Sequence, residues 1–484
     1  MKITQTGQSD GAYARYEKER IAHWDNLACK VDSWRGWGSY YHKRLKQVYG
    51  FLVPSGKKII EIGCAQGDLL AALKPAVGVG VDFSGEMIKR AKQRHPKMRF
   101  IQADAHKLDI KETFDVIVLS DIVNDLWDVE LLLEQVRHLS TPRTRLIINL
   151  YSRVWELPLI IAQRLGLARG NLAQNWLAPD DIVNLLDLTG FEVIRHWQEM
   201  LLPLPIPILS ALFNRYIAKI WPFRLMALTN FIMARPLSER SPSEKEPTVS
   251  IVVPARNEAG NIPEIFTRTP ELGRWTELLF VEGHSRDDTY KAIETAISKH
   301  PERKCKLLRQ KGKGKGDAVR LGFEEAGGDI LMILDADLST APEDMRRFYE
   351  ALRLGKGEFI NGVRLVYPRE KGAMRFLNFL GNKFFTLAFS WLMGQHVKDT
   401  LCGTKVLSKA DYDQIAANRS YFGDFDPFGD FDLLFGAAKS GLKIVDMPIR
   451  YRERTYGTTN IQRWRHGWLL LKMVVFGARR IKFI

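Results

Sequence analysis

The chain has 484 residues, of which 45% are hydrophobic and 26% are charged, a globular composition in a chain longer than one typical domain. Its four scattered cysteines have no CxxC spacing, which argues against a disulfide framework or a zinc site and fits a reducing compartment. The net charge of +15 is compatible with nucleic acid, anionic lipid or phosphorylated substrates, and the lack of a nucleic-acid-binding motif makes nucleic acid the weakest of the three.

Two blocks of alternating strand and helix patterns are separated by the segment PLSERSPSEKEP at 236–247, whose proline, serine and charge content is typical of a linker. We therefore predict a first domain over 1–236, a linker over 237–247 and a second domain over 248–484. Strands that alternate with helices predict the α/β class, with mostly parallel sheets covered on both faces.

The first block opens with a tryptophan-rich helical region at 12–53. Its predicted strands and helices then alternate, with strands at 58–62, 77–81, 99–102, 114–119, 145–150, 191–197 and 229–234, and helices at 67–73, 85–94, 130–139 and 180–189. The apolar stretch 201–233 is either a helical insertion that leads into the last strand or a segment lying on a membrane surface. Arg215, Lys219 and Arg224 interrupt it, so it is not expected to span a bilayer.

Small residues follow the first predicted strand, where Glu61 leads into Gly63 and Gly67 at the start of a helix. Such a turn lets the backbone approach a ligand at the helix N-terminus. Asp82 ends the next strand about 20 residues on, where a carboxylate can accept hydrogen bonds from ribose hydroxyls. A nucleoside-containing cofactor is therefore expected at this edge of the sheet.

The segments EIGCAQGDLL, VGVDFS, QADAHKL and FDVIVLSD together resemble class I S-adenosylmethionine-dependent methyltransferases, over about 50–235. A dinucleotide-binding Rossmann domain is the alternative. The resemblance implies S-adenosyl-L-methionine as cofactor, with these binding positions: Glu61, Gly63, Gly67, Asp82, Asp104 and Ala105. Where many relatives carry a histidine, this chain reads SDIVNDLWD, so Asp121 or Asp125 is the nearest candidate base, and we take Asp125 as the catalytic residue. A helix N-cap is the alternative role for Asp125.

The second block has predicted strands at 248–253, 277–281, 305–308 and 329–334, and the last of these ends on Asp335 and Asp337. The run 330–334 is continuously apolar, as in a strand buried on both faces of a parallel sheet. Carboxylates at such a strand end suit a hard divalent cation, and the lysine and glycine residues of 311–315 suit phosphates. A solvated strand end is the alternative.

The motifs TVSIVVPARNEAGNI, GKGKGDA and DADLS resemble the family two glycosyltransferases of the GT-A fold, and most of all the dolichyl- or polyprenyl-phosphate sugar synthases. The resemblance implies inverting transfer of a sugar from a nucleotide diphosphate to a lipid phosphate. Asp335 and Asp337 would hold Mg²⁺ or Mn²⁺, and Asp337 would act in catalysis. The substrate-binding positions it implies are Pro254, Arg256, Glu258, Val281, Glu282, Lys315, Asp335, Ala336, Arg364, Arg375 and Arg454.

Two departures from the family pattern leave the substrates open. Glu282 and Gly283 stand where Asp-Asp is usual, so the base of the donor nucleotide is undetermined, and Ser339 replaces a common glutamine. A phosphate acceptor needs no strong base, whereas a hydroxyl acceptor would need a carboxylate such as Asp430 or Asp432, of which we name Asp432. A loop or helix cap is the alternative for both.

The apolar segments 381–394 and 468–481 are too short to span a membrane, and Arg479, Arg480 and Lys482 at the second would suit anionic headgroups. Core helices are the alternative. We expect a bifunctional transferase, peripheral at the cytoplasmic, inner face of a membrane, acting on a nucleotide sugar and a polyprenyl phosphate or lipid-linked glycan and methylating a glycan or related acceptor. The alternatives are a single glycosyltransferase with a degenerate methyltransferase-like binding domain, and a nucleic-acid methyltransferase that rests on charge alone.

Overall fold

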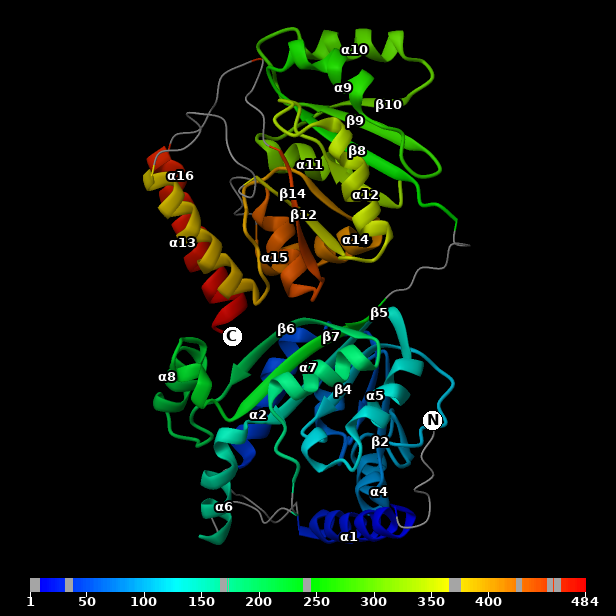
Figure 1. Ribbon diagram of the computed structural model, residues 1–484, viewed down its shortest axis with the longest axis vertical. Helices are drawn as coiled ribbons and strands as arrows, with labels where there is room; N and C mark the ends of the chain where they lie inside the picture. The colour runs from blue at the N-terminus through cyan, green and yellow to red at the C-terminus, as the bar shows by residue number, and fades with distance from the viewer. Residues whose placement is uncertain are drawn as a thin grey trace. The chain divides into compact units, whose positions relative to one another are not determined.

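The computed structural model describes residues 9–30, 38–165, 172, 174–237, 245–364, 376–423, 429–450, 456 and 463–484. The chain divides into two compact units, Met1–Leu237 with Phe483–Ile484, and Ser238–Lys482 (Figure 1). The division falls at the start of the predicted linker. Each unit holds its own seven-stranded sheet, and the predicted α/β class is confirmed.

The sheet of the first unit has the strand order β3-β2-β1-β4-β5-β7-β6. The strands from β3 to β5 run parallel, whereas β7 is antiparallel to both β5 and β6. Every residue of β1 after Lys58 is buried, including Glu61. The strands are β1 Lys58–Ile62, β2 Val77–Asp82, β3 Arg99–Gln102, β4 Phe114–Ser120, β5 Ser140–Tyr151, β6 Phe191–Glu199 and β7 Thr229–Pro236.

Helices cover this sheet, and each face carries its own hydrophobic core. The helices are α1 Ser9–Lys30, α2 Gly38–Leu52, α3 Asp68–Ala72, α4 Gly85–Arg94, α5 Val129–His138, α6 Glu156–Arg164, α7 Pro179–Leu188 and α8 Leu209–Arg215. Ser84 caps α4 by accepting a hydrogen bond from the Met87 N–H, and Asp128 caps α5 by accepting from the Leu131 N–H. The N-cap alternative for Asp125 is therefore wrong, because Asp128 holds that position.

The sheet of the second unit has the order β10-β9-β8-β11-β13-β12-β14, with β13 antiparallel to β11 and β12 and the other pairs parallel. Its strands are β8 Val249–Ala255, β9 Thr276–Glu282, β10 Lys304–Arg309, β11 Ile330–Ile333, β12 Phe359–Val363, β13 Lys405–Ser408 and β14 Ile444–Pro448. Its helices are α9 Ile262–Arg268, α10 Thr289–Lys299, α11 Lys315–Glu324, α12 Met345–Arg353, α13 Phe376–Met393, α14 Lys409–Ala417, α15 Phe431–Lys439 and α16 Arg463–Gly477.

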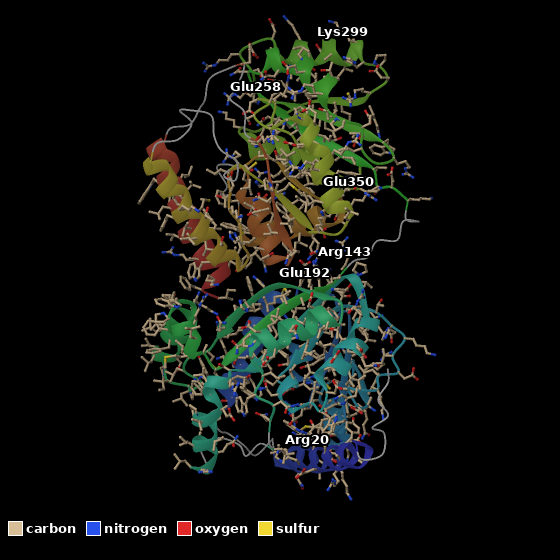
Figure 2. The ribbon with its side chains drawn as sticks, viewed as in Figure 1. Arg20, Arg143, Glu192, Glu258, Lys299 and Glu350 are labelled. Atoms are coloured by element: carbon tan, nitrogen blue, oxygen red, sulfur yellow. The ribbon has the colours of Figure 1, made fainter. Side chains whose placement is uncertain are left out.

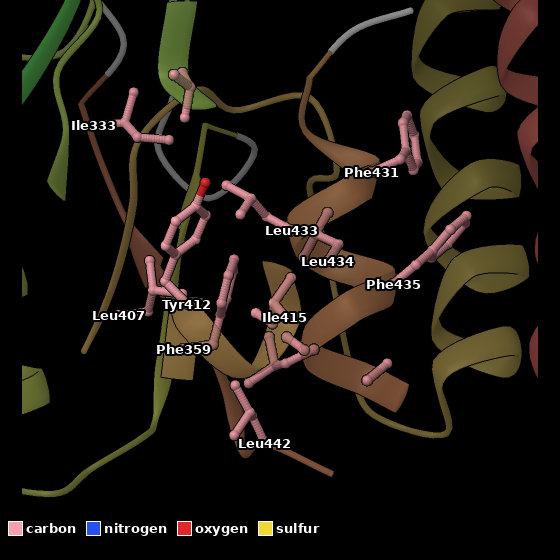
Figure 3. Close-up of a cluster of buried hydrophobic side chains, with 14 of the residues drawn as sticks. Ile333, Phe359, Leu407, Tyr412, Ile415, Phe431, Leu433, Leu434, Phe435 and Leu442 are labelled. Carbon is pink, nitrogen blue, oxygen red and sulfur yellow. The ribbon is translucent and has the colours of Figure 1, made fainter. Parts of the chain in front are cut away.

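One core of this unit is built around α15, which turns Leu433 toward the strands and Phe431 and Phe435 toward α13 (Figure 3). The ring centroids of Phe431 and Phe435 lie 5.5 Å apart, and Phe389 of α13 lies 5.0 Å from Phe431. Phe431 is completely buried. This core supports the strands whose carboxyl ends carry Asp335 and Arg364.

The helices α13 and α16 lie side by side (Figure 1) and bring together the two apolar segments that the sequence left ambiguous. Leu392, Met393, Leu470 and Met473 are buried against the core, so these segments are core helices on one face. Their outer faces still expose Phe384, Leu387, Trp468 and Val475. Of the helices that the structure describes, none is long and apolar enough to cross a membrane.

We expect Phe431→Ala to lower the free energy of unfolding of the second unit by roughly 3–5 kcal/mol, because it removes a wholly buried ring from the α15 core. Urea unfolding followed by circular dichroism measures the change. Leu387→Ala is the matched control: Leu387 is 72% exposed, so its removal should change stability by less than about 0.5 kcal/mol. Equal losses in the two variants would contradict the assignment of Phe431 to the core.

Candidate active sites

The turn after β1 is shaped by two glycines with left-handed backbone, Gly63 at φ 76° and Gly67 at φ 74°. A Cβ at Gly63 would lie 2.8 Å from the Ile122 side chain, and one at Gly67 would lie 2.6 Å from the Phe100 ring. Larger residues therefore fit neither the backbone nor the space. The buried Glu61 carboxylate accepts a hydrogen bond from the Leu70 N–H at 3.0 Å, which ties β1 to α3 and fixes the turn.

Asp82 lies beside this turn at the end of β2. Its carboxylate accepts hydrogen bonds from the backbone N–H groups of Ala65 at 2.8 Å and Ser84 at 2.9 Å. Burial raises the pKa of Asp82 to about 6, and the two N–H groups partly offset that rise. Each carboxylate oxygen has two lone pairs, so Asp82 retains capacity to accept from ligand hydroxyls, as predicted for a ribose.

Asp104 follows β3 and is contacted by α1, a helix that carries none of the sequence motifs. It accepts hydrogen bonds from the Tyr13 hydroxyl of α1 and from His106 Nδ1 at 2.7 Å. The Asp128 N–H donates to His106 Nε2, so Nδ1 carries the proton. Burial alone would raise the pKa of Asp104, but these hydrogen bonds outweigh it and lower the pKa to about 2. Ala105 is buried in the core, so only its backbone can reach a ligand.

Asp125, the predicted base, is also held by α1 (Figure 2 labels Arg20 on this helix). Arg20 Nε lies 3.0 Å from Oδ1 of Asp125, and Trp24 Nε1 donates to Oδ2 at 3.0 Å. Burial raises the pKa of Asp125, and the charge of Arg20 opposes that rise. The signal for these contacts was present in the sequence, because three- and four-residue spacings put four side chains on one helix face: Tyr13, Tyr16, Arg20 and Trp24.

Asp121 has the properties expected of a base to a greater degree than Asp125. It follows β4 with a left-handed backbone, φ 57°, and its Oδ1 accepts hydrogen bonds from the Tyr41 hydroxyl at 2.6 Å and from Asn149 Nδ2 at 2.5 Å. Burial raises the pKa of Asp121 to about 7, and the two hydrogen bonds partly offset the rise. A carboxylate with a near-neutral pKa and uncharged partners is suited to accept a proton.

In the second unit, Lys315 and Asp335 form an ion pair with Nζ 2.5 Å from Oδ1. Burial by itself would raise the pKa of Asp335, but the charge of Lys315 outweighs it and lowers the pKa. A Cβ at Gly403 would lie 2.0 Å from Asp335 and 2.1 Å from Lys315 Nζ, so only glycine allows this segment to pass the pair. Lys311 and Lys313 of the predicted phosphate loop are exposed, and Lys315 is the lysine of that loop that reaches a strand-end carboxylate.

Asp337 is nearly buried, and its Oδ1 accepts a hydrogen bond from the Ser339 N–H at 3.0 Å. Asp335 and Asp337 thus offer two carboxylates just beyond β11, which is the donor chemistry that Mg²⁺ or Mn²⁺ takes. Within the described ranges, no group of three or more His, Cys, Asp or Glu side chains is placed to hold a metal ion. Two carboxylates alone do not complete a coordination sphere, so a cation bound here would need further oxygen ligands from outside these side chains.

Arg364 follows β12, and its guanidinium makes a two-pronged contact with Asp399, Nε to Oδ2 at 2.8 Å and Nη2 to Oδ1 at 2.9 Å. Arg364 lowers the pKa of Asp399, although burial of Asp399 acts in the opposite direction. Because Asp399 occupies the side of the guanidinium that carries Nε and Nη2, the phosphate that the resemblance implies would have to bind on the other side of Arg364. Arg375 and Arg454 lie outside the described residues.

The predicted nucleotide segments lie at the ends of β8 and β9. Glu258 accepts a hydrogen bond from Asn261 Nδ2 at 2.8 Å, and Glu282 accepts from the Ser285 N–H at 2.5 Å, so both carboxylates help to order their loops. Of the remaining predicted residues, Pro254 is half-buried and Arg256 is exposed, whereas Val281 and Ala336 are buried in the core, where only their backbones can meet a ligand.

At Gly283, where the family usually has an acid, a side chain would have to displace Gln310. A Cβ there would lie 2.8 Å from Gln310 Oε1. The Gln310 amide is buried and donates to the Gly314 carbonyl and to Asp317 Oδ2, both at 3.2 Å. The side chain of Gln310 therefore fills the space beside the loop, which the motif pattern alone did not predict.

Asp430 and Asp432, the predicted alternatives for a base, are both paired with cations. Asp430 lies 3.4 Å from Nζ of the wholly buried Lys405 and makes no side-chain cap on α15. Asp432 Oδ2 lies 2.8 Å from Arg419 Nε and 4.0 Å from Arg320. Asp430 occupies the N-cap position of α15, as the capping alternative predicted, although its side chain makes no capping hydrogen bond, and Asp432 lies in the first turn of the helix.

Comparison with known proteins assigns both halves. A family model described as glycosyl transferase family 2 matches residues 250–415, and one described as a methyltransferase domain matches residues 54–185. The dolichol-phosphate mannosyltransferase of Pyrococcus furiosus is 36% identical over 248 residues, which are 49% of this chain and 67% of that protein. The undecaprenyl-phosphate 4-deoxy-4-formamido-L-arabinose transferase of Pseudomonas aeruginosa is 33% identical over 111 residues, 22% of this chain and 33% of that protein.

Among solved structures, a S-adenosylmethionine-dependent methyltransferase of Thermotoga maritima aligns with 44% of this chain and 99% of its own, with 16% identity and a TM-score of 0.36.

The raised pKa of Asp121 predicts a pH dependence of stability. The folded state keeps this proton where the unfolded chain releases it, so the contribution of Asp121 to the free energy of unfolding of the first unit should fall, by on the order of 1–4 kcal/mol, as pH rises from about 4 to about 7, and then level off. Urea unfolding across this pH range measures it. Glu61 and Asp82 titrate in the same direction, so the contribution of Asp121 is the difference from Asp121→Asn. Identical pH profiles for the two proteins would rule out the raised pKa.

Proposed function

The chain belongs to the family 2 glycosyltransferases through its second half and carries a S-adenosylmethionine-dependent methyltransferase domain in its first half, and from this premise we propose a bifunctional action on lipid-linked sugars. The second unit moves a sugar from a nucleotide diphosphate to a polyprenyl phosphate or a lipid-linked glycan, with inversion. The first unit methylates a glycan or a related acceptor. The observation that carries the transfer proposal is the pair Asp335 and Asp337 beyond β11, with Lys315 bound to the first.

A polyprenyl phosphate is proposed as acceptor because two relatives are named for transfer to dolichol phosphate and to undecaprenyl phosphate. The charges of this chain favour the same choice. Asp432, the residue predicted as base for a hydroxyl acceptor, is engaged by Arg419, so proton removal there would have to compete with an ion pair. A phosphate acceptor is already anionic and needs no such base.

The residues of the second unit would act by holding charge in place. Asp335 and Asp337 would hold a divalent cation that, when bound, offsets the charge of the leaving diphosphate. Lys315, fixed by Asp335, and Arg364, fixed by Asp399, would add cationic groups whose positions are set before substrate arrives. The buried Lys405–Asp430 pair lies close enough for its lysine to lower the pKa of Asp335 further.

In the first unit, Gly63 and Gly67 would let the backbone reach the methionine part of the cofactor, and Asp82 would accept from its ribose. Asp121 would accept a proton from the methyl acceptor, with Tyr41 and Asn149 positioning its carboxylate. We assign Asp125 only a positioning role, because its two carboxylate oxygens accept hydrogen bonds from Arg20 and Trp24.

We place the protein at the inner, cytoplasmic face of a membrane, where a polyprenyl acceptor is embedded and both co-substrates are supplied from water. The exposed apolar faces of α13 and α16, with the exposed Arg479 and Arg480 at their end, support a peripheral contact in the second unit.

The second candidate is a single glycosyltransferase whose first unit only binds or scaffolds. It is favoured by the way α1 side chains hold Asp104 and Asp125, two of the predicted functional carboxylates. Binding of S-adenosylmethionine to the full chain separates the two candidates.

We expect Asp335→Ala and Asp337→Ala each to lower kcat by roughly 10²–10³-fold in a transfer assay with nucleotide sugars, Mg²⁺ or Mn²⁺ and polyprenyl phosphate, because each removes a carboxylate that would hold the cation that offsets the charge of the leaving diphosphate. Asp413→Ala is the control, since Asp413 is an exposed carboxylate on α14 and should leave kcat unchanged. Full activity in the double Asp335→Ala/Asp337→Ala variant would remove the proposed role of the pair.

We expect Asp82→Asn to weaken S-adenosylmethionine binding by roughly 10–100-fold in calorimetry, because it removes an acceptor for the ribose and one that orders the Ala65 turn. Asp187→Asn, at an exposed position on α7, is the control. If the unaltered chain binds no S-adenosylmethionine, the bifunctional proposal fails and the scaffold candidate stands.

A further inference from the structure

The first unit carries a large exposed apolar surface that neither candidate site uses. Of the 26 large hydrophobic side chains that are exposed in the described part of the chain, 15 lie in two segments, 154–165 and 206–226. We call this the α6–α8 surface, after the helices it contains. Its most exposed members include Leu157 at 71%, Ile208 at 85%, Trp221 at 70%, Leu225 at 56% and Met226 at 61%.

The two segments meet at the start of α6. Trp155 Nε1, just before α6, donates a hydrogen bond to the Met226 carbonyl at 2.8 Å, and the Ser152 N–H donates to the Leu228 carbonyl at 2.7 Å. Figure 1 shows α6 and α8 on the same side of the first unit. Both segments therefore face the surroundings together.

Packing within the first unit explains only part of this surface: Leu159 packs against the core, and the Tyr216 ring lies 5.0 Å from the Phe483 ring. Helix α6 is mostly apolar yet has no buried residue, and the single turn Phe223–Met226 has none either. Ile208 is a β-branched residue in left-handed backbone, φ 64°, and is the most exposed large hydrophobic residue of the surface. Left-handed backbone is costly for such a side chain, so its position is better explained by contact with a partner than by folding.

The charges of the α6–α8 surface indicate which kind of partner it binds. No acidic residue occurs between positions 200 and 235, and Arg215 and Arg224 are exposed among the apolar side chains. On the α6 segment, Arg153 and Arg164 are exposed, and Glu156 is the one acid. Apolar residues flanked by arginines, with the exposed Trp221 and Tyr216, are typical of a protein face that lies in an anionic membrane interface. A second copy docked face to face would bring these arginines together, which disfavours self-association.

We propose that the α6–α8 surface docks on a phospholipid bilayer with anionic headgroups and holds the methyltransferase unit at the membrane. The inference rests on the proposed function in one respect, that the methyl acceptor belongs to the same lipid-linked material as the sugar acceptor. Docking would then present this unit to an acceptor in the membrane, independently of the contact made by α13 and α16 of the glycosyltransferase unit.

The test places an environment-sensitive fluorophore at Leu225→Cys in the full chain, in a background whose four native cysteines are replaced by alanine. The matched probe is Leu188→Cys, a residue 65% exposed at the end of α7 and outside the surface. Vesicles of phosphatidylcholine with phosphatidylglycerol should shift the emission of the probe at 225 to the blue and leave that at 188 unchanged. Phosphatidylcholine alone should give a weaker shift, because the arginines then lack anionic partners.

A second measurement uses Leu225→Glu, which places a charge on the face that would insert into the bilayer. If the α6–α8 surface provides the main contact, this change should weaken flotation with the anionic vesicles by at least ~10-fold. Leu188→Glu should float like the unaltered chain, and circular dichroism with thermal unfolding checks that both variants fold. Flotation with no emission shift at 225 would place the membrane contact elsewhere and overturn the proposal, and so would a shift that depends on protein concentration without lipid. Absence of both flotation and shift would overturn it too. None of these readouts uses catalysis, so failure of the proposed function remains a separate result.

Discussion

Both candidate sites depend on one constraint, the parallel pairing of neighbouring strands, which delivers the ends of distant segments to the same sheet edge. In the first unit the register that sets Ile62 opposite Val81 lets the Gly63 N–H donate to the Val81 carbonyl, and Asp82 follows directly beside the turn. In the second unit the same pairing sets Ile333 opposite Val252, and Asp335 emerges two residues later. These registers alone bring the side chains of each site to one edge of the sheet, and their side-chain contacts then fix the detail.

Two carboxylates of the first site and two of the second have pKa values shifted in opposite directions. Asp82 and Asp121 are held by backbone N–H groups, a hydroxyl and an amide, which do not outweigh burial, and their pKa values rise to about 6 and about 7. Asp335 and Asp399 are held by Lys315 and Arg364, and their pKa values fall. The first arrangement is suited to groups that take up or share protons, and the second to groups that must stay anionic near a cation and phosphates.

The fusion becomes understandable if both acceptors are held by a membrane. A polyprenyl phosphate cannot leave the bilayer, so an enzyme that acts on it must come to the surface. Each unit exposes an apolar face with arginines, one over α13 and α16 and the other over α6 and α8. Two weak surface contacts in one chain bind more tightly than either alone, because the second forms at a high effective concentration.

The sequence by itself determined the α/β class, the strands of the first sheet, four of the seven strands of the second, and the identity of the motifs, because apolar runs and glycine turns act over a few neighbouring residues. The strands β12, β13 and β14 were not predicted from it. The spacing of four side chains in the sequence also indicates that they share one helix face, but not which residues they contact: Tyr13, Tyr16, Arg20 and Trp24. Only the tertiary structure decided that Asp128 rather than Asp125 caps α5, that Arg364 grips Asp399, and that Gln310 fills the space beside Gly283. Arg364 and Asp399 are 35 positions apart and Arg20 and Asp125 are 105 apart, and no local pattern encodes which distant partner a side chain meets.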